Sequence, residues 1–195
     1  MFATLTHEQM AREYLNREFG AETPSTLQAV ATFEQHPLEG EGPVTLFSFT
    51  ASRDGNRPED FHVIAGETKP NYYPDWGLSP DDLYSVHIGT RFMLVLEVGQ
   101  LPLEELPSGL EEEIALLLGS VAPDEPIADF RPVAAFDMEG QRHAVCRLRL
   151  ADEELYVLGG DLPLGIYRRV DLPPHVIYRL HLGKLIRLEE AAEEQ

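Results

Sequence analysis

The sequence contains a single cysteine, no long apolar run and no recognisable secretory signal. Cys146 has no partner for a disulfide within the chain, which is compatible with a reducing compartment. The longest uninterrupted apolar runs, at 92–96 and 114–118, have five residues, whereas a membrane-spanning helix needs about 18. The first residues lack the basic start and apolar middle of a signal peptide. We therefore expect a cytoplasmic protein with no membrane partner.

Basic residues are also scarce. The chain has 15 Lys and Arg against 34 Asp and Glu, which gives a net charge of −19. This charge repels phosphate groups and anionic lipid, so we expect no nucleic-acid partner. Residues 1–130 carry 6 basic and 23 acidic side chains, whereas residues 131–187 carry 9 and 7. The asymmetry fits a basic protein partner or an arginine-lined surface of the same molecule; the alternative is that acidity keeps a bacterial-type cytosolic protein soluble.

Signatures of metal and cofactor sites are missing as well. The seven histidines include no pair at the spacing of a zinc-binding helix. The phosphate-binding loop and the dinucleotide-binding fingerprint are both absent. We therefore predict neither a metal nor a cofactor. No internal repeat and no low-complexity segment is evident.

What the sequence does contain is enough apolar material for a core. At 195 residues and 43% hydrophobic content, the chain is long enough for one domain. We expect a single domain over 1–195, with a minor lobe boundary near 121–132, where three prolines and three carboxylates predict a long connection. The segment 189–195 is rich in Glu and predicts a flexible acidic tail.

Capping residues followed by glycines predict three helices. The first runs from the capping box of Thr6 and Gln9 to Gly20. The second and third are expected at 80–88 and 109–118, each begun by a serine and ended by the glycine that follows it.

The remaining apolar segments are typical of strands. The run 91–98 is nearly continuous apolar sequence between charges, so we expect it to form the central strand, with 93–96 almost fully buried. Other strands are expected at 26–35, 44–51, 61–65, 133–138, 144–150, 155–158 and 165–170. The segment 175–188 fits a strand or a helix. These patterns predict an α+β fold, mainly antiparallel sheet, with three or so helices packed on it.

The predicted loop at 66–78 is the most suggestive stretch for binding. Tyr72, Tyr73 and Trp76 stand there beside Asp75, between residues that stiffen the backbone. Rigid aromatic side chains with a polar tip are good contact anchors, so these four are candidate binding residues. The alternative is that the rings fold back over the core.

Asp75, Asp82 and His87 are the candidate catalytic residues. Carboxylates in different environments can divide acid and base roles, and a histidine titrates near neutral pH. Against this interpretation, Asp82 lies in the first turn of a predicted helix, where the helix macrodipole alone explains a carboxylate.

Arg147, Arg149, Arg168 and Arg169 are candidate anion-binding residues. Arg147 and Arg149 alternate along a predicted strand, so their side chains point to one face. The simpler expectation is that these arginines pair with the chain's own carboxylates. Cys146, on the opposite face of the strand, is expected in the core.

On these grounds we expect a non-catalytic cytosolic protein-binding module or adaptor, whose partner is another protein or a second copy of the chain. The alternative is a small-molecule hydrolase or transferase with an acidic and aromatic site around residues 72–87. The sequence alone leaves open whether the protein is an enzyme.

Overall fold

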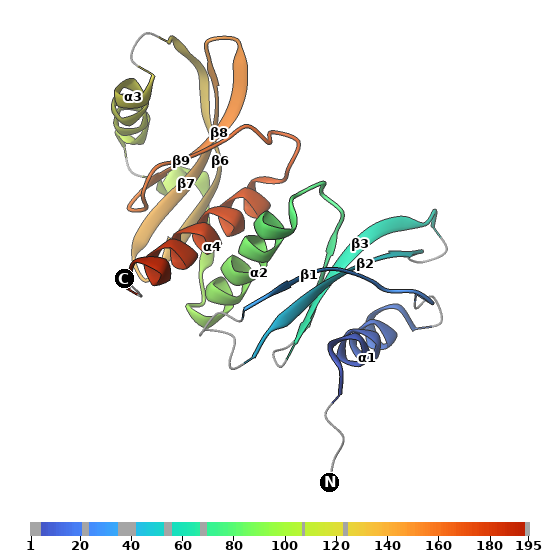
Figure 1. The fold of residues 1–195 in the computed structure, drawn as a ribbon. Coiled ribbons are helices and arrows are strands. Elements are labelled where there is room, and N and C mark those ends of the chain that lie inside the picture. Colours follow the sequence, from blue (N-terminus) through green and yellow to red (C-terminus); the bar gives the residue numbers. More distant parts are fainter. Residues whose placement is uncertain are drawn as a thin grey trace. The chain divides into compact units, whose positions relative to one another are not determined.

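The computed structural model describes residues 5–20, 24–34, 42–52, 56–66, 70–106, 108–122 and 125–193. This part of the chain contains four α-helices, a short 3-10 helix and two antiparallel sheets, which confirms the predicted α+β class (Figure 1). None of its helices combines the length and apolar character needed to span a membrane. Internal contacts divide the chain into two compact units, Met1–Ile88 and Gly89–Gln195. The segment 121–132 lies inside the second unit, and the single-domain expectation remains a prediction.

The first unit is a four-stranded sheet between two helices. Its elements are α1 (His7–Phe19), β1 (Gln28–Phe33), β2 (Val44–Ala51), β3 (Glu59–Gly66), β4 (Asn71–Pro74) and the first part of α2 (Pro80–Val95). The strands pair in the order β1-β2-β3-β4. α1 packs Ala11 and Leu15 against one face of this sheet (Figure 1). The first part of α2 covers the other face, where Tyr84 stacks on Phe33 with 4.4 Å between ring centroids.

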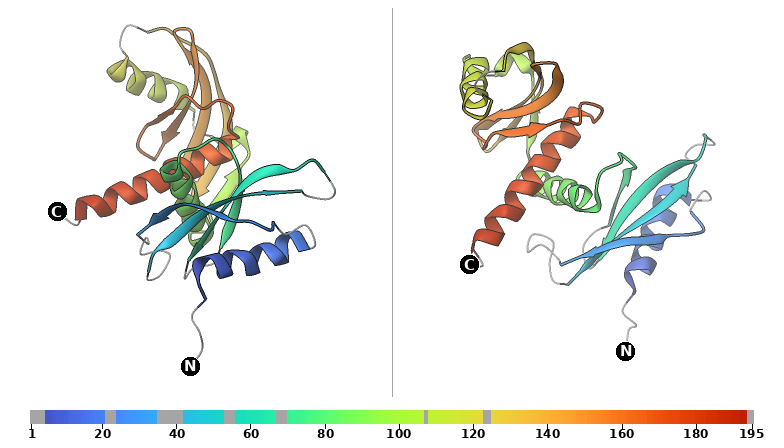
Figure 2. Two further views of the ribbon diagram at one scale, coloured as in Figure 1. Left: turned by 45° about the vertical axis from the view of Figure 1, so that its right-hand side comes forward. Right: turned by 45° about the horizontal axis from the view of Figure 1, so that its top comes forward.

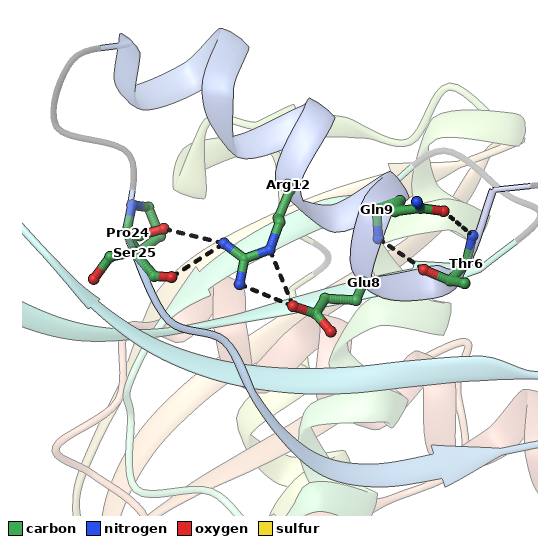
Figure 3. Close-up of polar contacts among 6 residues, drawn as sticks. All are labelled: Thr6, Glu8, Gln9, Arg12, Pro24 and Ser25. Atoms are coloured by element: carbon green, nitrogen blue, oxygen red, sulfur yellow. Dashed lines mark hydrogen bonds and ion pairs between the residues drawn. The ribbon is translucent and has the colours of Figure 1, made fainter.

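The beginning of α1 follows from its sequence. The Thr6 hydroxyl accepts the Gln9 N–H at 3.2 Å, and the Gln9 side chain accepts the Thr6 N–H at 2.8 Å, which confirms the predicted capping box (Figure 3). Arg12 donates hydrogen bonds to the carbonyl oxygens of Pro24 and Ser25 at 3.5 and 3.3 Å. These contacts tie the helix to the segment that leads into β1.

The second unit is a five-stranded sheet, again between helices. Its elements after α2 are β5 (Gly99–Leu101), η3 (Leu103–Glu105), α3 (Leu110–Val121), β6 (Ile127–Met138), β7 (Gln141–Leu150), β8 (Glu153–Gly160), β9 (Gly165–Tyr167) and α4 (Pro174–Glu193). The strands pair in the order β5-β6-β7-β8-β9. α3 packs Ile114 and Leu118 on the face that holds Cys146, which is fully buried as expected. α4 covers the opposite face, where Tyr178 stacks on Phe136 (Figure 2).

Apart from β5 and η3, the two units repeat one plan of a helix, four antiparallel strands and a helix: α1, β1–β4 and α2 in the first, α3, β6–β9 and α4 in the second. β3 and β8, β4 and β9, and α2 and α4 begin at positions that differ by 94 in each case. The first strand of each repeat carries a bulge, at Val30 in β1 and at Val133 in β6. In each repeat, a tyrosine of the last helix also stacks on a phenylalanine of the first strand. The pairs are Tyr84 with Phe33 and Tyr178 with Phe136.

The repeat is visible in the sequence once the elements are aligned, although none was evident from the sequence alone. Nine of the thirty-one residues in 59–89 are identical in 153–183. In the first segment they are Glu59, Val63, Gly66, Tyr73, Leu78, Pro80, Tyr84, His87 and Gly89. These identities are scattered, and the offset between equivalent residues rises to 99 at the second strand, where Val44 corresponds to His143. The changing offset hides the periodicity.

α2 corrects two predictions. The helix does not end at Gly89 but continues to Val95. A Cβ atom at position 89 would overlap the carbonyl oxygen of Arg179 in α4, so this glycine permits a close approach of two helix backbones. The central strand expected at 91–98 is therefore wrong. Leu94 and Val95, expected to be dry, are 68% and 61% exposed.

The backbone geometry that ends α2 was not predicted from the sequence. The N–H of Val98 donates to the carbonyl oxygen of Met93 at 3.0 Å, and Glu97 between them has a φ of 51°. This arrangement is a Schellman motif, in which a left-handed residue reverses the chain after the last turn. A glutamate occupies the position where glycine is usual.

Several other boundaries differ from the predictions. Tyr72 and Tyr73 lie in β4 and not in a loop. α3 runs past Gly119 to Val121. The undecided segment 175–188 is helical, and α4 continues through Glu193 into the predicted tail, whose last two residues lie outside the described part.

Candidate functional site

The aromatic residues expected to bind a partner mostly belong to the core. Tyr73 is only 3% exposed. Tyr72 is half-buried and packs edge-on against Phe19 and Phe61, at 5.2 and 6.0 Å between ring centroids. Trp76 is half-buried beside Tyr73. The arrangement favours the alternative in which these rings cover the core, and it leaves Asp75 as the exposed member of the four.

Asp75 is held in place just after β4. Its N–H donates to the carbonyl oxygen of Asp60 at 2.9 Å, which continues the pairing of β3 and β4 by one residue. Its carboxylate accepts the N–H of Gly77 at 2.8 Å, which is an Asx turn. The side chain therefore has a fixed position at the edge of the first sheet.

Asp75 lines an open groove of about 340 Å³ on the first sheet. We call this the acidic groove, and its polar lining residues are Thr26, Gln28, Ser48, Thr50, Asp60, His62 and Asp75. Gln28, Ser48 and His62 lie opposite one another on β1, β2 and β3, so their side chains share one face. This face is opposite to the one that α1 covers, which holds the apolar residues of the same strands.

Asp60 and His62 differ in how far they are open to a new polar contact. Asp60 accepts a hydrogen bond from the Thr50 hydroxyl at 2.7 Å, which leaves carboxylate capacity for another donor. Nδ1 of His62 is buried and makes no hydrogen bond with the described residues. Carboxylates, hydroxyls and an imidazole on one concave surface can bind a cationic or multiply hydrogen-bonding group.

The three candidate catalytic residues do not share this surface. Asp82 lies in the first turn of α2, where its N–H donates to the Ser79 hydroxyl at 3.1 Å. His87 is fully buried, and its Nδ1 lies 2.9 Å from the hydroxyl of Tyr73. Among these three residues, Asp75 alone lines the acidic groove. A substrate in the groove would not touch the imidazole of His87.

The pair of Tyr73 and His87 recurs in the second unit. Tyr167 and His181 are also fourteen residues apart, with the same 2.9 Å between hydroxyl and Nδ1. The two rings meet edge to face in both units, at interplanar angles of 89° and 87°. A pair repeated with the fold is explained by the packing of helix on sheet, so His87 needs no catalytic role.

The candidate anion-binding arginines contact carboxylates of their own unit. Arg147 pairs with Glu154 at 2.6 Å, Arg168 with Glu153 at 2.9 Å, and Arg149 with Asp129. Arg169 binds both oxygens of Asp171, at 2.8 and 2.9 Å. The hydrogen bond from Arg147 lowers the pKa of Glu154 below its usual range. The expected internal pairing is thus confirmed, whereas anion binding by these residues remains a prediction.

Two lining residues, Asp60 and His62, were missed as site residues. The signal was present: they alternate with Phe61 and Val63 in β3, so a half-buried strand puts them on the polar face together. The alternation shows that both residues lie on one face of β3. It does not show which part of that face remains open in the folded protein. Within the described ranges, no group of three His, Cys, Asp or Glu side chains is arranged to hold a metal ion.

Comparisons of the chain with protein-family models, curated proteins and solved structures find no match.

Proposed function

We propose that the protein is a non-catalytic cytosolic binding module that meets a basic segment of a protein partner through the acidic groove. The observation that carries this proposal is the clustering of Asp60, His62 and Asp75 on an open concave face of the first sheet. A lysine or arginine side chain entering the groove would form charge-assisted hydrogen bonds with the two carboxylates. The net charge of −19 would speed the encounter with such a partner.

The burial of His87 supports a non-catalytic protein. A general base must come within hydrogen-bonding distance of the proton that it removes. His87 is fully buried and belongs to a pair that the second unit repeats. A hydrolase or transferase built around residues 72–87 would have to act without this imidazole.

A titration with a lysine-rich peptide of about ten residues tests the proposal. Trp76, the only tryptophan, follows Asp75 in the sequence, so its fluorescence is the readout of the titration. We expect the double variant Asp60→Asn, Asp75→Asn to bind about tenfold more weakly than the wild type, because two partly exposed charge contacts together contribute about 1.4 kcal/mol. Added salt should weaken binding to the wild type.

The matched control is Glu104→Gln, Asp152→Asn, which changes the net charge equally at two exposed positions outside the groove. Equal weakening in both double variants would mean that the peptide senses the overall charge and not the groove. That outcome, or no binding by the wild type at low salt, would overturn the proposal.

A second copy of the chain is the other partner that the sequence left open. Arg131 lies opposite Arg147 in the second sheet, is exposed and forms no ion pair among the described residues. It could therefore supply the basic group. Sedimentation at low and high salt distinguishes this case, because self-association through the groove should disappear in the Asp60→Asn, Asp75→Asn variant.

A further inference from the structure

A second cavity, of about 320 Å³, opens in the second unit. It lies where the end of α2, the edge of the sheet at β5 and β6, and the first turns of α4 meet. We call it the α4 pocket. Its volume is at the lower end of the range for small-molecule sites, about 300 to 1,000 Å³.

The sequence builds the apolar wall of the α4 pocket with three local devices. Gly89 lets α2 and α4 approach closely, which places Met93, one turn later, beside the α4 pocket. The Schellman motif then brings Val98 back to the same place, because this motif joins the residues on either side of the helix end. The bulge in β6 turns both Val133 and Ala134 toward the cavity, although consecutive residues of a regular strand point to opposite faces.

The polar groups of the α4 pocket are cationic or neutral. Arg179 and His175 line it from α4, and Gln100 lines it from β5. Nε of Arg179 is buried and makes no hydrogen bond with the described residues. Among the described residues that line the α4 pocket there is no carboxylate, although 34 of the 195 residues are acidic. A guanidinium against an apolar wall, without an acidic neighbour in the lining, is suited to an anion that also carries apolar groups.

The first unit shows that these cationic groups are not required by the fold. With the offset of 94, His175 corresponds to Asp81 and Arg179 to Ser85. The Ser85 hydroxyl donates to the carbonyl oxygen of Asp81 at 3.1 Å, so this turn of α2 forms with small polar side chains. The arginine and histidine are therefore particular to the second repeat.

We propose that the α4 pocket binds a small organic carboxylate with an apolar body, its carboxylate on Arg179 and its hydrocarbon part against Met93, Val98 and Phe136. Gln100 supplies a further hydrogen-bond donor to the bound carboxylate. Because the lining combines apolar side chains with Gln100, His175 and Arg179, neither a bare inorganic anion nor an uncharged hydrocarbon satisfies all of it. The site is separate in sequence and lining from the acidic groove, so it does not depend on the function proposed above.

Titration of the full chain with octanoate, followed by NMR of backbone amides and methionine methyl groups, tests this proposal. We expect saturable shifts at Met93, Gln100 and His175. 1-Octanol and inorganic phosphate, the apolar and anionic parts alone, should each bind at least about tenfold more weakly. Arg179→Met keeps the stem of the side chain and removes its charge, and it should weaken octanoate binding about tenfold or more, the effect of losing a charge-assisted hydrogen bond.

Arg131→Met is the matched control, because Arg131 is an exposed arginine of β6 in the second unit and lies outside the α4 pocket. It should bind octanoate as the wild type does. Gln100→Trp is the second test, for the case that Arg179→Met does not fold. It keeps the charge of Arg179 and fills the cavity from an exposed edge position, so it should also abolish octanoate binding. Octanoate that binds Arg179→Met as tightly as the wild type, phosphate that binds as tightly as octanoate, or no shifts at these residues would each overturn the proposal.

Discussion

The hydroxyl of Tyr167 donates its hydrogen bond to Nδ1 of His181. The direction is fixed by the other ring nitrogen, since Nε2 of His181 lies 2.9 Å from the carbonyl oxygen of Pro163, which can only accept. Nε2 therefore carries the proton, and Nδ1 accepts from the hydroxyl at 2.9 Å. Burial lowers the pKa of His181, which keeps this neutral form dominant in the folded protein. Tyr73 and His87 stand in the same relation of sequence and distance in the first unit.

We expect Tyr167→Phe and Tyr73→Phe each to lower the free energy of unfolding by about 1 to 3 kcal/mol. Each variant removes a hydroxyl and leaves a buried imidazole nitrogen without that partner, which costs more than the hydrogen bond itself contributes. Chemical denaturation measures the loss. Tyr14→Phe is the comparison, because its hydroxyl makes a longer, partly buried contact of 3.4 Å and should cost less. A loss below about 0.5 kcal/mol in both core variants would show that the pair is not structural.

Gly89→Ala and Gly119→Ala should have opposite effects. Both glycines lie inside helices, where alanine is favoured by about 1 kcal/mol. At position 89 the added methyl group would overlap the carbonyl oxygen of Arg179, so α2 and α4 must separate and stability should fall. At position 119 no described atom, apart from the chain neighbours and the backbone of the helix itself, lies within 4 Å of the added methyl group, and stability should rise by up to about 1 kcal/mol. Thermal melting of the two variants provides the measurement. A higher melting temperature in both would mean that Gly89 is not needed for the close approach of α2 and α4.

Leu94→Ala should cost little and Leu118→Ala should cost about 2 to 5 kcal/mol. Leu94 is 68% exposed in α2, so truncation removes few contacts. Leu118 is fully buried between α3 and the second sheet, and its truncation would leave a cavity. Denaturant unfolding of both variants measures the difference. Equally large losses of stability in both variants would contradict the exposed position of Leu94 and favour the buried strand predicted for the apolar run at 93–96.

Stability should fall as the pH is lowered from about 7.5 to about 5.5. Burial holds the pKa of His143 and His181 below the usual 6.5 in the folded protein, so the unfolded chain binds more protons once the pH drops below that value. The stability present above pH 6.5 is therefore lost on acidification, by at most about 1.4 kcal/mol for each histidine at one pH unit below its unfolded pKa.

Melting temperatures across this pH range provide the measurement. His143→Gln should reduce the slope, and His143→Gln, His181→Gln should reduce it further, although both variants start from a lower stability. A melting temperature of the wild type that stays constant or rises on acidification would contradict the prediction.

Much of the fold could be predicted because the deciding interactions are local. Thr6 and Gln9 cap α1 through atoms three residues apart, and the β-branched and aromatic residues of 44–51 favour the strand that forms there. The core position of Cys146 followed from the same alternation in β7. The internal pairing of the arginines was also foreseen, since strand geometry and charge both favour it.

The candidate site was predicted less well, because a sequence does not show which parts of a surface are covered. Tyr73 was expected to contact a partner and His87 was a candidate catalytic residue, but the fold buries both. Asp60 and His62 were overlooked, because the sequence does not show where a polar strand face forms a groove. Accessibility at each position was set by a helix packed on the sheet and not by the residue itself.

The sequence by itself therefore determined the N-terminal caps of α1 and α2, the alternation in β3 and β7, the charge and the α+β class. Only the tertiary structure decided the role of Gly89, the exposure of the apolar run that follows it, and the repeat of one plan in two units. Gly89 would end an isolated helix, because glycine is a poor helix former and a good left-handed cap. In the folded protein the close contact with the backbone of α4 outweighs that preference, and the helix continues through it.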